Sequence, residues 1–427
     1  MRPFITGIVA AVGLVAMVGQ VAGADGIRRF NVAVMDSAGR AAEGVTAADL
    51  VVTEGGRAQR PVFVRRSGVQ PVLVVLDLFN TTLGERGALV KETAEALAAM
   101  RETDRVYLYV LDLAGKLDAV HGLPVSEAEA AQAQGAWGRE AGSLIERRLR
   151  EVSRSREVNL TTGERVKSTY AALERAGSML AALPGNKRLA WMSRGVPLGY
   201  REKSRATEID YGKALDGLSR TLGECGVSVA TIDLPVVRGA TPDGLSSRET
   251  LRQLAAGTGG RYFEGGYGIG RALTGLIREA GASYTVGYRS ASKGHGAVAV
   301  TAAGARWQIV APASIGGAGR GDGRVLVDGA VASFYDATEI GVAVEAVRVG
   351  ERWRVQARVD GRDAGHGELE TGLVMLQGDG KRTVVDGIAM SGEYPFAENV
   401  RRVRVVVRDV QSGEIGSKTV ELERGAR

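Results

Sequence analysis

Two continuous apolar runs separated by a helical stretch constrain the fold of this chain more than any other feature. Residues 71–76 and 106–111 lack the alternation of a half-exposed strand, which is typical of parallel strands buried on both faces. Between them, residues 85–100 place apolar side chains at the three- and four-residue spacing of an amphipathic helix. Further strands are predicted at 188–192 and 227–232, each followed by a helical stretch. This alternation predicts an α/β fold with a doubly wound, mostly parallel sheet.

The segments on either side of this region have a strand pattern instead. Residues 25–68 contain short alternating runs between Gly and Asp turns, which indicate a small N-terminal β module. The strand–helix alternation occupies 69–290, and 291–323 hold one more strand and a glycine-rich linker. From 324 to 427 strands recur roughly every ten residues, which predicts a C-terminal antiparallel β-sandwich. The 60 glycines among 427 residues fit this turn-rich β structure.

The N-terminus predicts export. Residues 1–24 contain one early arginine, an uncharged apolar stretch and the ending Ala22-Gly23-Ala24, which together are typical of a secretory signal peptide cleaved before Asp25. The alternative is an uncleaved anchor helix, because the apolar stretch is nearly long enough to span a bilayer. With cleavage, the mature protein is expected in the periplasm or outside the cell, with no membrane span. ATP and NAD are scarce there, and no cofactor is expected.

Composition argues against several functional classes. The formal charge of +6 comes from 55 basic and 49 acidic residues of interspersed sign, and no nucleic-acid-binding motif is present, so we expect no nucleic-acid partner. A single cysteine, Cys225, excludes an internal disulfide. The histidines His121, His295 and His366 have no metal-ligand spacing, which argues against zinc hydrolase chemistry. Trp191 is interpreted as a core residue. No catalytic constellation emerges, and the chain is predicted not to be an enzyme.

The loop after the first buried strand carries the strongest functional signal. It reads Leu76-Asp77-Leu78-Phe79-Asn80-Thr81, so a carboxylate and a hydroxyl follow the strand at its carboxyl end. Open sheets of this kind bind ligands beyond the carboxyl ends of their strands. The same position holds the metal-binding motif D-x-S-x-S in von Willebrand factor A domains. A plainer alternative is that Asp77 is a turn carboxylate that accepts hydrogen bonds from loop amides beside Asn80.

The order of several segments resembles a narrower group, the bacterial VWFA-related family. The loop above is similar to its L-D-x-x-N-T pattern, and 254–263 is similar to its L-A-x-x-T-G-G-x-x-F pattern. The other matching segments are, in chain order, 30–32, 49–56, 183–195 and 284–288. The resemblance implies a von Willebrand factor A-like domain between the two β modules.

The same resemblance implies a site in these loops. Asp77, Thr81 and Thr169 match metal-ligand positions, whereas Phe79 and Ser193 stand where the family pattern has a hydroxyl and an aspartate. With a single carboxylate, we expect at most weak Mg²⁺ binding. The ligand-binding loops are then expected to present five residues, namely Asp77, Asn80, Thr81, Thr169 and Ser193.

Three functional hypotheses follow. The leading one is an exported, non-enzymatic protein that binds a protein or cell-envelope ligand through these loops. The second is a cell-envelope hydrolase in which loop carboxylates such as Asp77 and Asp233 perform acid–base chemistry, as paired carboxylates do when held roughly 5–10 Å apart. The third is a purely structural component of the envelope. The oligomeric state does not follow from the sequence.

Overall fold

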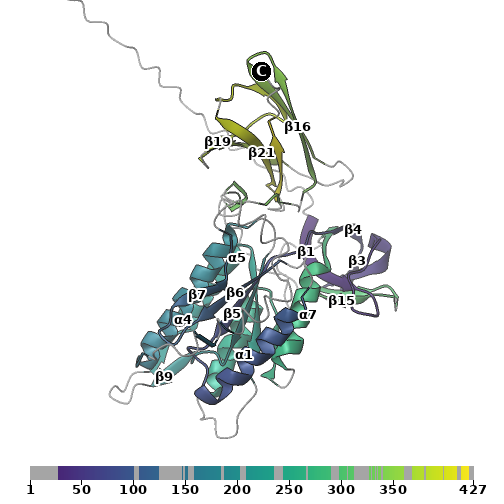
Figure 1. The fold of residues 1–427 in the computed structure, drawn as a ribbon. Coiled ribbons are helices and arrows are strands. Elements are labelled where there is room, and N and C mark those ends of the chain that lie inside the picture. The colour runs from purple at the N-terminus through teal and green to yellow at the C-terminus, as the bar shows by residue number, and fades with distance from the viewer. Residues whose placement is uncertain are drawn as a thin grey trace, which may run out of the picture.

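The computed structural model of the chain (Figure 1) describes most of residues 27–422. Nothing is described for 1–26, 101–104, 125–146, 148–149, 152–157, 184–186, 202–207, 235–243, 266–267, 290–297, 305, 312–326, 328, 332, 334, 338–339, 360–367, 379–380, 398, 411–414 and 423–427. The predicted signal peptide and the glycine-rich stretch at 316–323 therefore lie outside the described residues. Within the described part, no helix is long and apolar enough to cross a membrane.

A six-stranded mixed sheet forms the centre of the molecule, with the strand order β12-β11-β8-β5-β6-β7. Its strands are β5 (Val72–Asp77), β6 (Val106–Leu111), β7 (Leu117–His121), β8 (Lys187–Ser193), β11 (Val227–Asp233) and β12 (Tyr262–Phe263). All neighbours are parallel except β7, which turns back antiparallel to β6. Every residue of β5 and β6 is buried, as their continuous apolar runs predicted.

Helices cover both faces of the mixed sheet (Figure 1). One face packs on α1 (Leu83–Ala98) and α7 (Ile269–Gly281). The other packs on α4 (Thr162–Ala181), α5 (Gly212–Glu224) and α6 (Gly244–Gly257). The predicted helix at 85–100 corresponds to α1. The antiparallel strand β7, by contrast, was not predicted.

A second module combines strands from before and after the mixed sheet. One antiparallel sheet has the order β15-β1-β13-β4, and another has the order β14-β2-β3. The two sheets enclose a core that includes Phe30, Val52, Tyr284 and Tyr288. The strands are β1 (Ile27–Met35), β2 (Leu50–Glu54), β3 (Arg57–Gln59), β4 (Pro61–Arg66), β13 (Ser283–Arg289), β14 (Val298–Ala302) and β15 (Gln308–Val310). In the sequence, these strands lie in three successive predicted segments, 25–68, 69–290 and 291–323. In the fold they pair with one another.

The C-terminal residues form two antiparallel sheets that pack face to face. Their orders are β16-β17-β20 and β19-β18-β21-β22, and the core between them contains Trp353, Leu373 and Val405. The strands are β16 (Val342–Val349), β17 (Arg352–Val359), β18 (Leu369–Gln377), β19 (Arg382–Asp386), β20 (Ser391–Tyr394), β21 (Val400–Asp409) and β22 (Ile415–Glu421). We call this unit the sandwich. A remaining antiparallel pair, β9 (Gly199–Arg201) and β10 (Glu208–Asp210), follows β8.

The fold-class prediction, an α/β chain built on a doubly wound and mostly parallel sheet, is wrong. Among the described residues, sixteen of twenty-two strands belong to antiparallel sheets, and the one sheet that contains parallel pairs is mixed. The chain is therefore mostly β. The prediction failed because periodicity identifies strands but not their partners: β13 follows helix α7, yet it pairs antiparallel with β1 and β4 instead of joining the central sheet.

A short segment within 327–340 joins the sandwich to the mixed-sheet module. On the sandwich side, Ala330 and Ala337 cover the outer face of the four-stranded sheet, where the buried Arg404 of β21 donates hydrogen bonds to the carbonyls of Ala330 (3.0 Å) and Ser333 (2.6 Å). On the other side, Tyr335 packs in the core of the mixed sheet, and the guanidinium of Arg105 lies 4.9 Å from its ring. We call this segment the junction.

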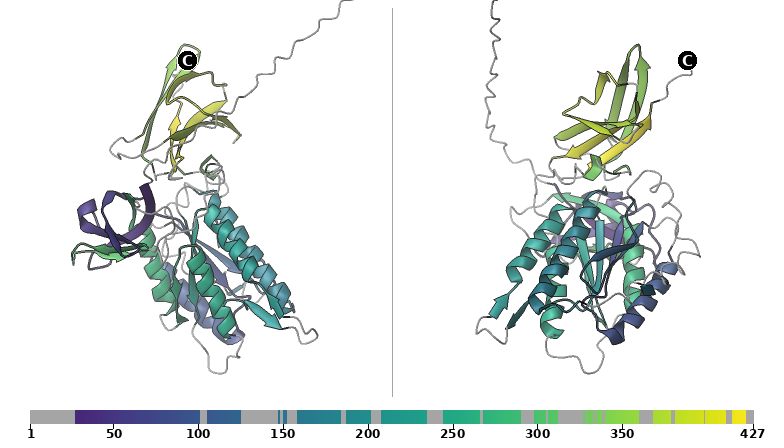
Figure 2. Two further views of the ribbon diagram at one scale, coloured as in Figure 1. Left: turned by 180° about the vertical axis from the view of Figure 1, so that it is seen from behind. Right: turned by 60° about the vertical axis from the view of Figure 1, so that its left-hand side comes forward.

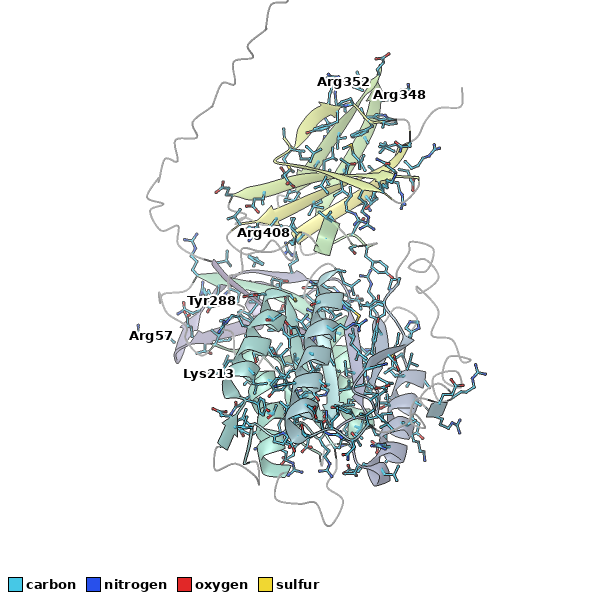
Figure 3. All side chains as sticks on the ribbon, turned by 90° about the vertical axis from the view of Figure 1, so that its left-hand side faces the viewer. Arg57, Lys213, Tyr288, Arg348, Arg352 and Arg408 are labelled. Atoms are coloured by element: carbon cyan, nitrogen blue, oxygen red, sulfur yellow. The ribbon has the colours of Figure 1, made fainter. Side chains whose placement is uncertain are left out.

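The junction attaches the sandwich to the amino edge of the mixed sheet, because Arg105 immediately precedes β6. In both views of Figure 2 the sandwich lies at one end of the molecule. In Figure 3, Arg408 lies at the end of the sandwich that faces the other modules, whereas Arg348 and Arg352 lie at its far tip. The carboxyl edge of the mixed sheet consequently points away from the sandwich (Figure 1).

Candidate functional site

Three polar residues end neighbouring strands at the carboxyl edge of the mixed sheet. Asp77 ends β5, Ser193 ends β8 and Asp233 ends β11, and Ser193 pairs in register with Asp233. All three are almost completely buried, with exposures of 0%, 0% and 1%. Side chains in register on parallel strands share a face, so this row forms the last layer of the core beneath α4 and α6.

The Asp77 carboxylate accepts hydrogen bonds from three side chains at one oxygen. Oδ2 accepts from Ser193 Oγ at 2.6 Å, from Asn80 Nδ2 at 2.8 Å and from Trp191 Nε1 at 3.0 Å. Oδ1 accepts from the backbone N–H of Asn80 at 2.9 Å. Burial raises the pKa of Asp77, and hydrogen bonds from Asn80 and Ser193 oppose that rise without cancelling it. Every partner is a donor, which suits an ionised carboxylate.

Asn80 links this strand end to helix α4. Its Nδ2 group donates to Thr169 Oγ1 at 2.9 Å as well as to Asp77, while Thr169 Oγ1 itself donates to the carbonyl of Arg165 at 2.9 Å. The Oδ1 atom of Asn80 is buried without a hydrogen-bond partner. Thr81 turns back toward the strand, and its hydroxyl donates to the backbone carbonyl of Asp77.

Phe79 turns inward instead of facing solvent. It is 2% exposed and packs in the core beneath α4, where the guanidinium of Arg165 lies 4.3 Å from its ring centre and donates to its carbonyl. The apolar side chain at this motif position thus anchors the loop by burial, a role that a hydroxyl could not fill.

The loops after β5 and β8 are tied together by an ion pair between Glu85 and Arg194. Glu85 lies in the first turn of α1 and also accepts from the hydroxyl of Thr82 at 2.7 Å. Partial burial by itself would raise the pKa of Glu85, but hydrogen bonds from Arg194 and Thr82 outweigh it, and the net pKa is lowered. Gly195 follows with a φ of +76°, and a Cβ there would lie 2.2 Å from the carbonyl of Ser247, so only glycine fits.

Asp233 has a different environment. Its Oδ2 lies 2.9 Å from Arg248 Nε and accepts from the hydroxyl of Tyr262 at 3.2 Å, whereas its Oδ1 is buried without a hydrogen-bond partner. Burial raises the pKa of Asp233, and the charge of Arg248 opposes the rise. The residue is therefore a buried, paired carboxyl.

The residues at this edge do not fit the divalent cation that the family resemblance implies. A cation held by Asp77 and Thr169 needs free lone pairs that point to a common position. Asp77 Oδ2 already accepts three hydrogen bonds, and the Nδ2 group of Asn80 lies between Asp77 and Thr169. Elsewhere in the described residues, no group of three or more His, Cys, Asp or Glu side chains is placed to hold a metal.

The structure brings together all five predicted loop residues, Asp77, Asn80, Thr81, Thr169 and Ser193, in one hydrogen-bonded network. Sequence reasoning missed Trp191, which is buried as a core residue but also supplies a donor to Asp77. One signal was available, because a buried indole N–H usually needs an acceptor and Trp191 lies two residues before Ser193, on the same face of the strand. The ion pairs of Arg194 and Arg248 had no such signal.

Comparisons with known proteins give no family. No protein-family model matches the chain, and no curated protein matches it. Among solved structures it is similar to the open conformation of the pilus adhesin SpaC from Lactobacillus rhamnosus GG, with 10% identity and a TM-score of 0.32 over 93% of this chain and 56% of that one. It is also similar to proximal thread matrix protein 1 from the mussel byssus, with 12% identity and a TM-score of 0.29 over 55% and 49%.

A third similar structure is a β-glucosidase from Listeria innocua, with 12% identity and a TM-score of 0.20 over 88% of this chain and 48% of that one. The chain thus spans about half the length of each of these three structures. At these TM-scores the similarities support no conclusion about fold or function.

Proposed function

We propose that this chain is an exported, non-enzymatic protein that binds a protein or cell-envelope ligand at the carboxyl edge of its mixed sheet. The observation that carries the proposal is the position of this edge. Loops from β5, β8 and the start of α4 converge there, at the end of the mixed sheet opposite the junction and the sandwich (Figure 1). A partner could therefore reach this edge without contacting the sandwich, which lies at the opposite end of the mixed sheet.

A rigid base and one exposed apolar side chain both support recognition at this edge. The Asp77 network and the Glu85–Arg194 ion pair hold the loops in one conformation, which lowers the entropy lost on binding. Leu83, the first residue of α1, is 79% exposed, the highest exposure among the large apolar side chains in the described part of the chain. An exposed leucine surrounded by polar groups can be buried when a partner binds, because protein interfaces have an apolar centre and a polar rim.

The hydrolase hypothesis finds less support in the geometry. It needs two carboxyl groups that reach a substrate, yet Asp77 and Asp233 are 0% and 1% exposed, and Asp77 uses both of its oxygens as acceptors. The resemblance to the bacterial VWFA-related family remains a prediction from the order of the segments, and export remains a prediction from residues 1–24.

The test uses Leu83, whose replacement leaves the core unchanged. The mature protein, its Leu83→Asp variant and a Val347→Asp control are immobilised and exposed to envelope extract. Val347 is an exposed apolar residue of the sandwich, with 50% exposure, and supplies a matched surface change away from the proposed site. Aspartate in the first turn of α1 also suits the helix dipole, so the fold should tolerate it.

We expect the bound component, once identified by mass spectrometry, to bind the Leu83→Asp variant at least tenfold more weakly and the Val347→Asp control with unchanged affinity. Equal binding by all three proteins, or loss only in the Val347→Asp control, would place recognition elsewhere.

A further inference from the structure

The position of the Asn80 carboxamide suggests how this edge is held together. Its nitrogen lies 2.8 Å from Asp77 Oδ2 and 2.9 Å from Thr169 Oγ1, and an amide nitrogen carries two hydrogens, one for each acceptor. The same two oxygens belong to the ligand set that the family resemblance assigns to a cation.

Neighbouring bonds fix the orientation of this amide. The Thr169 hydroxyl donates to the carbonyl of Arg165, so its oxygen is left to accept from Asn80. A flipped amide would place its carbonyl oxygen against the Asp77 carboxylate, which cannot donate when ionised. In this orientation the Oδ1 atom is buried and unpartnered, and the two hydrogen bonds of Nδ2 offset that cost.

We propose that the Asn80 carboxamide replaces a cation at this edge, so that a covalently attached donor, and not an exchangeable ion, bridges β5 and α4. The loops are then in their final arrangement without metal, and partner binding is insensitive to chelators. This inference does not rest on the proposed function, because it concerns the protein without any partner.

The isosteric variant Asn80→Asp tests the inference directly. It places a second carboxylate oxygen 2.8 Å from Asp77 Oδ2, where two like charges repel unless one carboxyl takes up a proton or a cation lies between them. Without added metal, both the repulsion and the proton uptake cost free energy. Without divalent ions at neutral pH, we expect the melting temperature of this variant to fall by roughly 4–10 °C, and millimolar Mg²⁺, Mn²⁺ or Ca²⁺ to restore most of the loss.

The controls are the wild-type protein and Asn399→Asp, the same change at an exposed asparagine of the sandwich whose Nδ2 donates to Gln377. Both should shift by less than about 1 °C on addition of the ions. The inference is overturned if the wild-type protein is stabilised by the ions, if Asn80→Asp is as stable as the wild type without them, or if no ion restores it.

A second variant covers the case in which Asn80→Asp does not fold. Asn80→Ala removes the bridging donor and leaves the Asp77 and Thr169 oxygens facing a small cavity. At millimolar Mn²⁺, native mass spectrometry should detect weak binding to Asn80→Ala, which keeps the single carboxylate of Asp77, and no binding to the wild type. Absence of binding to both would also overturn the inference.

Discussion

The indole N–H of Trp191 donates a 3.0 Å hydrogen bond to Asp77 Oδ2, from one fully buried side chain to another across the β5–β8 pair. The only polar side-chain group of this core tryptophan thus donates to a single acceptor, the Asp77 carboxylate. Because no water reaches either group, the bond links the packing of the sheet to the geometry of the loop that follows it.

This relationship predicts a large effect of removing the carboxylate. Asp77→Ala leaves the donors of Trp191, Asn80 and Ser193 without their acceptor, and we expect the free energy of unfolding to fall by about 3–5 kcal/mol. That exceeds the roughly 1 kcal/mol of an exposed capping bond. Denaturant unfolding followed by tryptophan fluorescence measures it. A loss below about 1 kcal/mol would show that the network contributes little to stability.

The raised pKa of Asp77 predicts a pH dependence of defined sign. Above the ordinary value of 3.8 and up to its raised folded-state pKa, the native protein binds this proton more tightly than the unfolded chain does. The contribution of Asp77 to the free energy of unfolding should therefore decrease as pH rises from 3.8 through the raised folded-state pKa. The stability difference between the wild type and Asp77→Asn isolates this contribution. A difference that is constant or increases with pH would contradict the raised pKa.

The junction predicts where proteases cut. Arg404 binds the carbonyls of Ala330 and Ser333 and lies 3.6 Å from the Asp336 carboxylate, so cleavage of the wild type should occur in the glycine-rich stretch at 316–323 and spare 330–337. In Arg404→Ala the cuts should extend into 330–337. The control is Arg354→Ala, which removes an exposed arginine paired with Glu393. Identical fragments from Arg404→Ala and the wild type would mean that Arg404 does not hold the junction.

Export predicts a new N-terminus. If the signal peptide is cleaved after Ala24, mass spectrometry of the natively produced protein should find Asp25 as the first residue. An intact Met1 in a membrane fraction would indicate the anchor helix instead.

The strands and helices of the central region were largely predictable, because burial imposes a period on the sequence. The runs predicted at 106–111 and 227–232 correspond to β6 and β11, and the helical stretch predicted after the strand at 188–192 corresponds to α5. Pairing was not predictable. Nothing local to Ser283–Arg289 distinguishes a strand of the mixed sheet from one that joins β1, because the partners lie far away in the sequence.

The residues of the candidate site could be predicted from the sequence, but the role of each residue could not. Asp77 was expected to hold a cation weakly or to accept loop amides, and the structure shows the second arrangement with two additional donors, Trp191 and Ser193. Asn80 occupies a position that the metal motif leaves open. Its role depends on a hydroxyl of α4 that comes within 2.9 Å only in the folded chain.

Strand β1 lies between β13 and β15, with Ile27 paired to Arg289 and Ala33 to Val310. The first described strand thus cannot pair with its neighbours during synthesis until the whole mixed-sheet region has followed. Closing so long a loop costs entropy before any contact forms, and contacts between distant segments slow folding. The amino-terminal strand should consequently be among the last to dock, and should close the module after the central sheet has assembled.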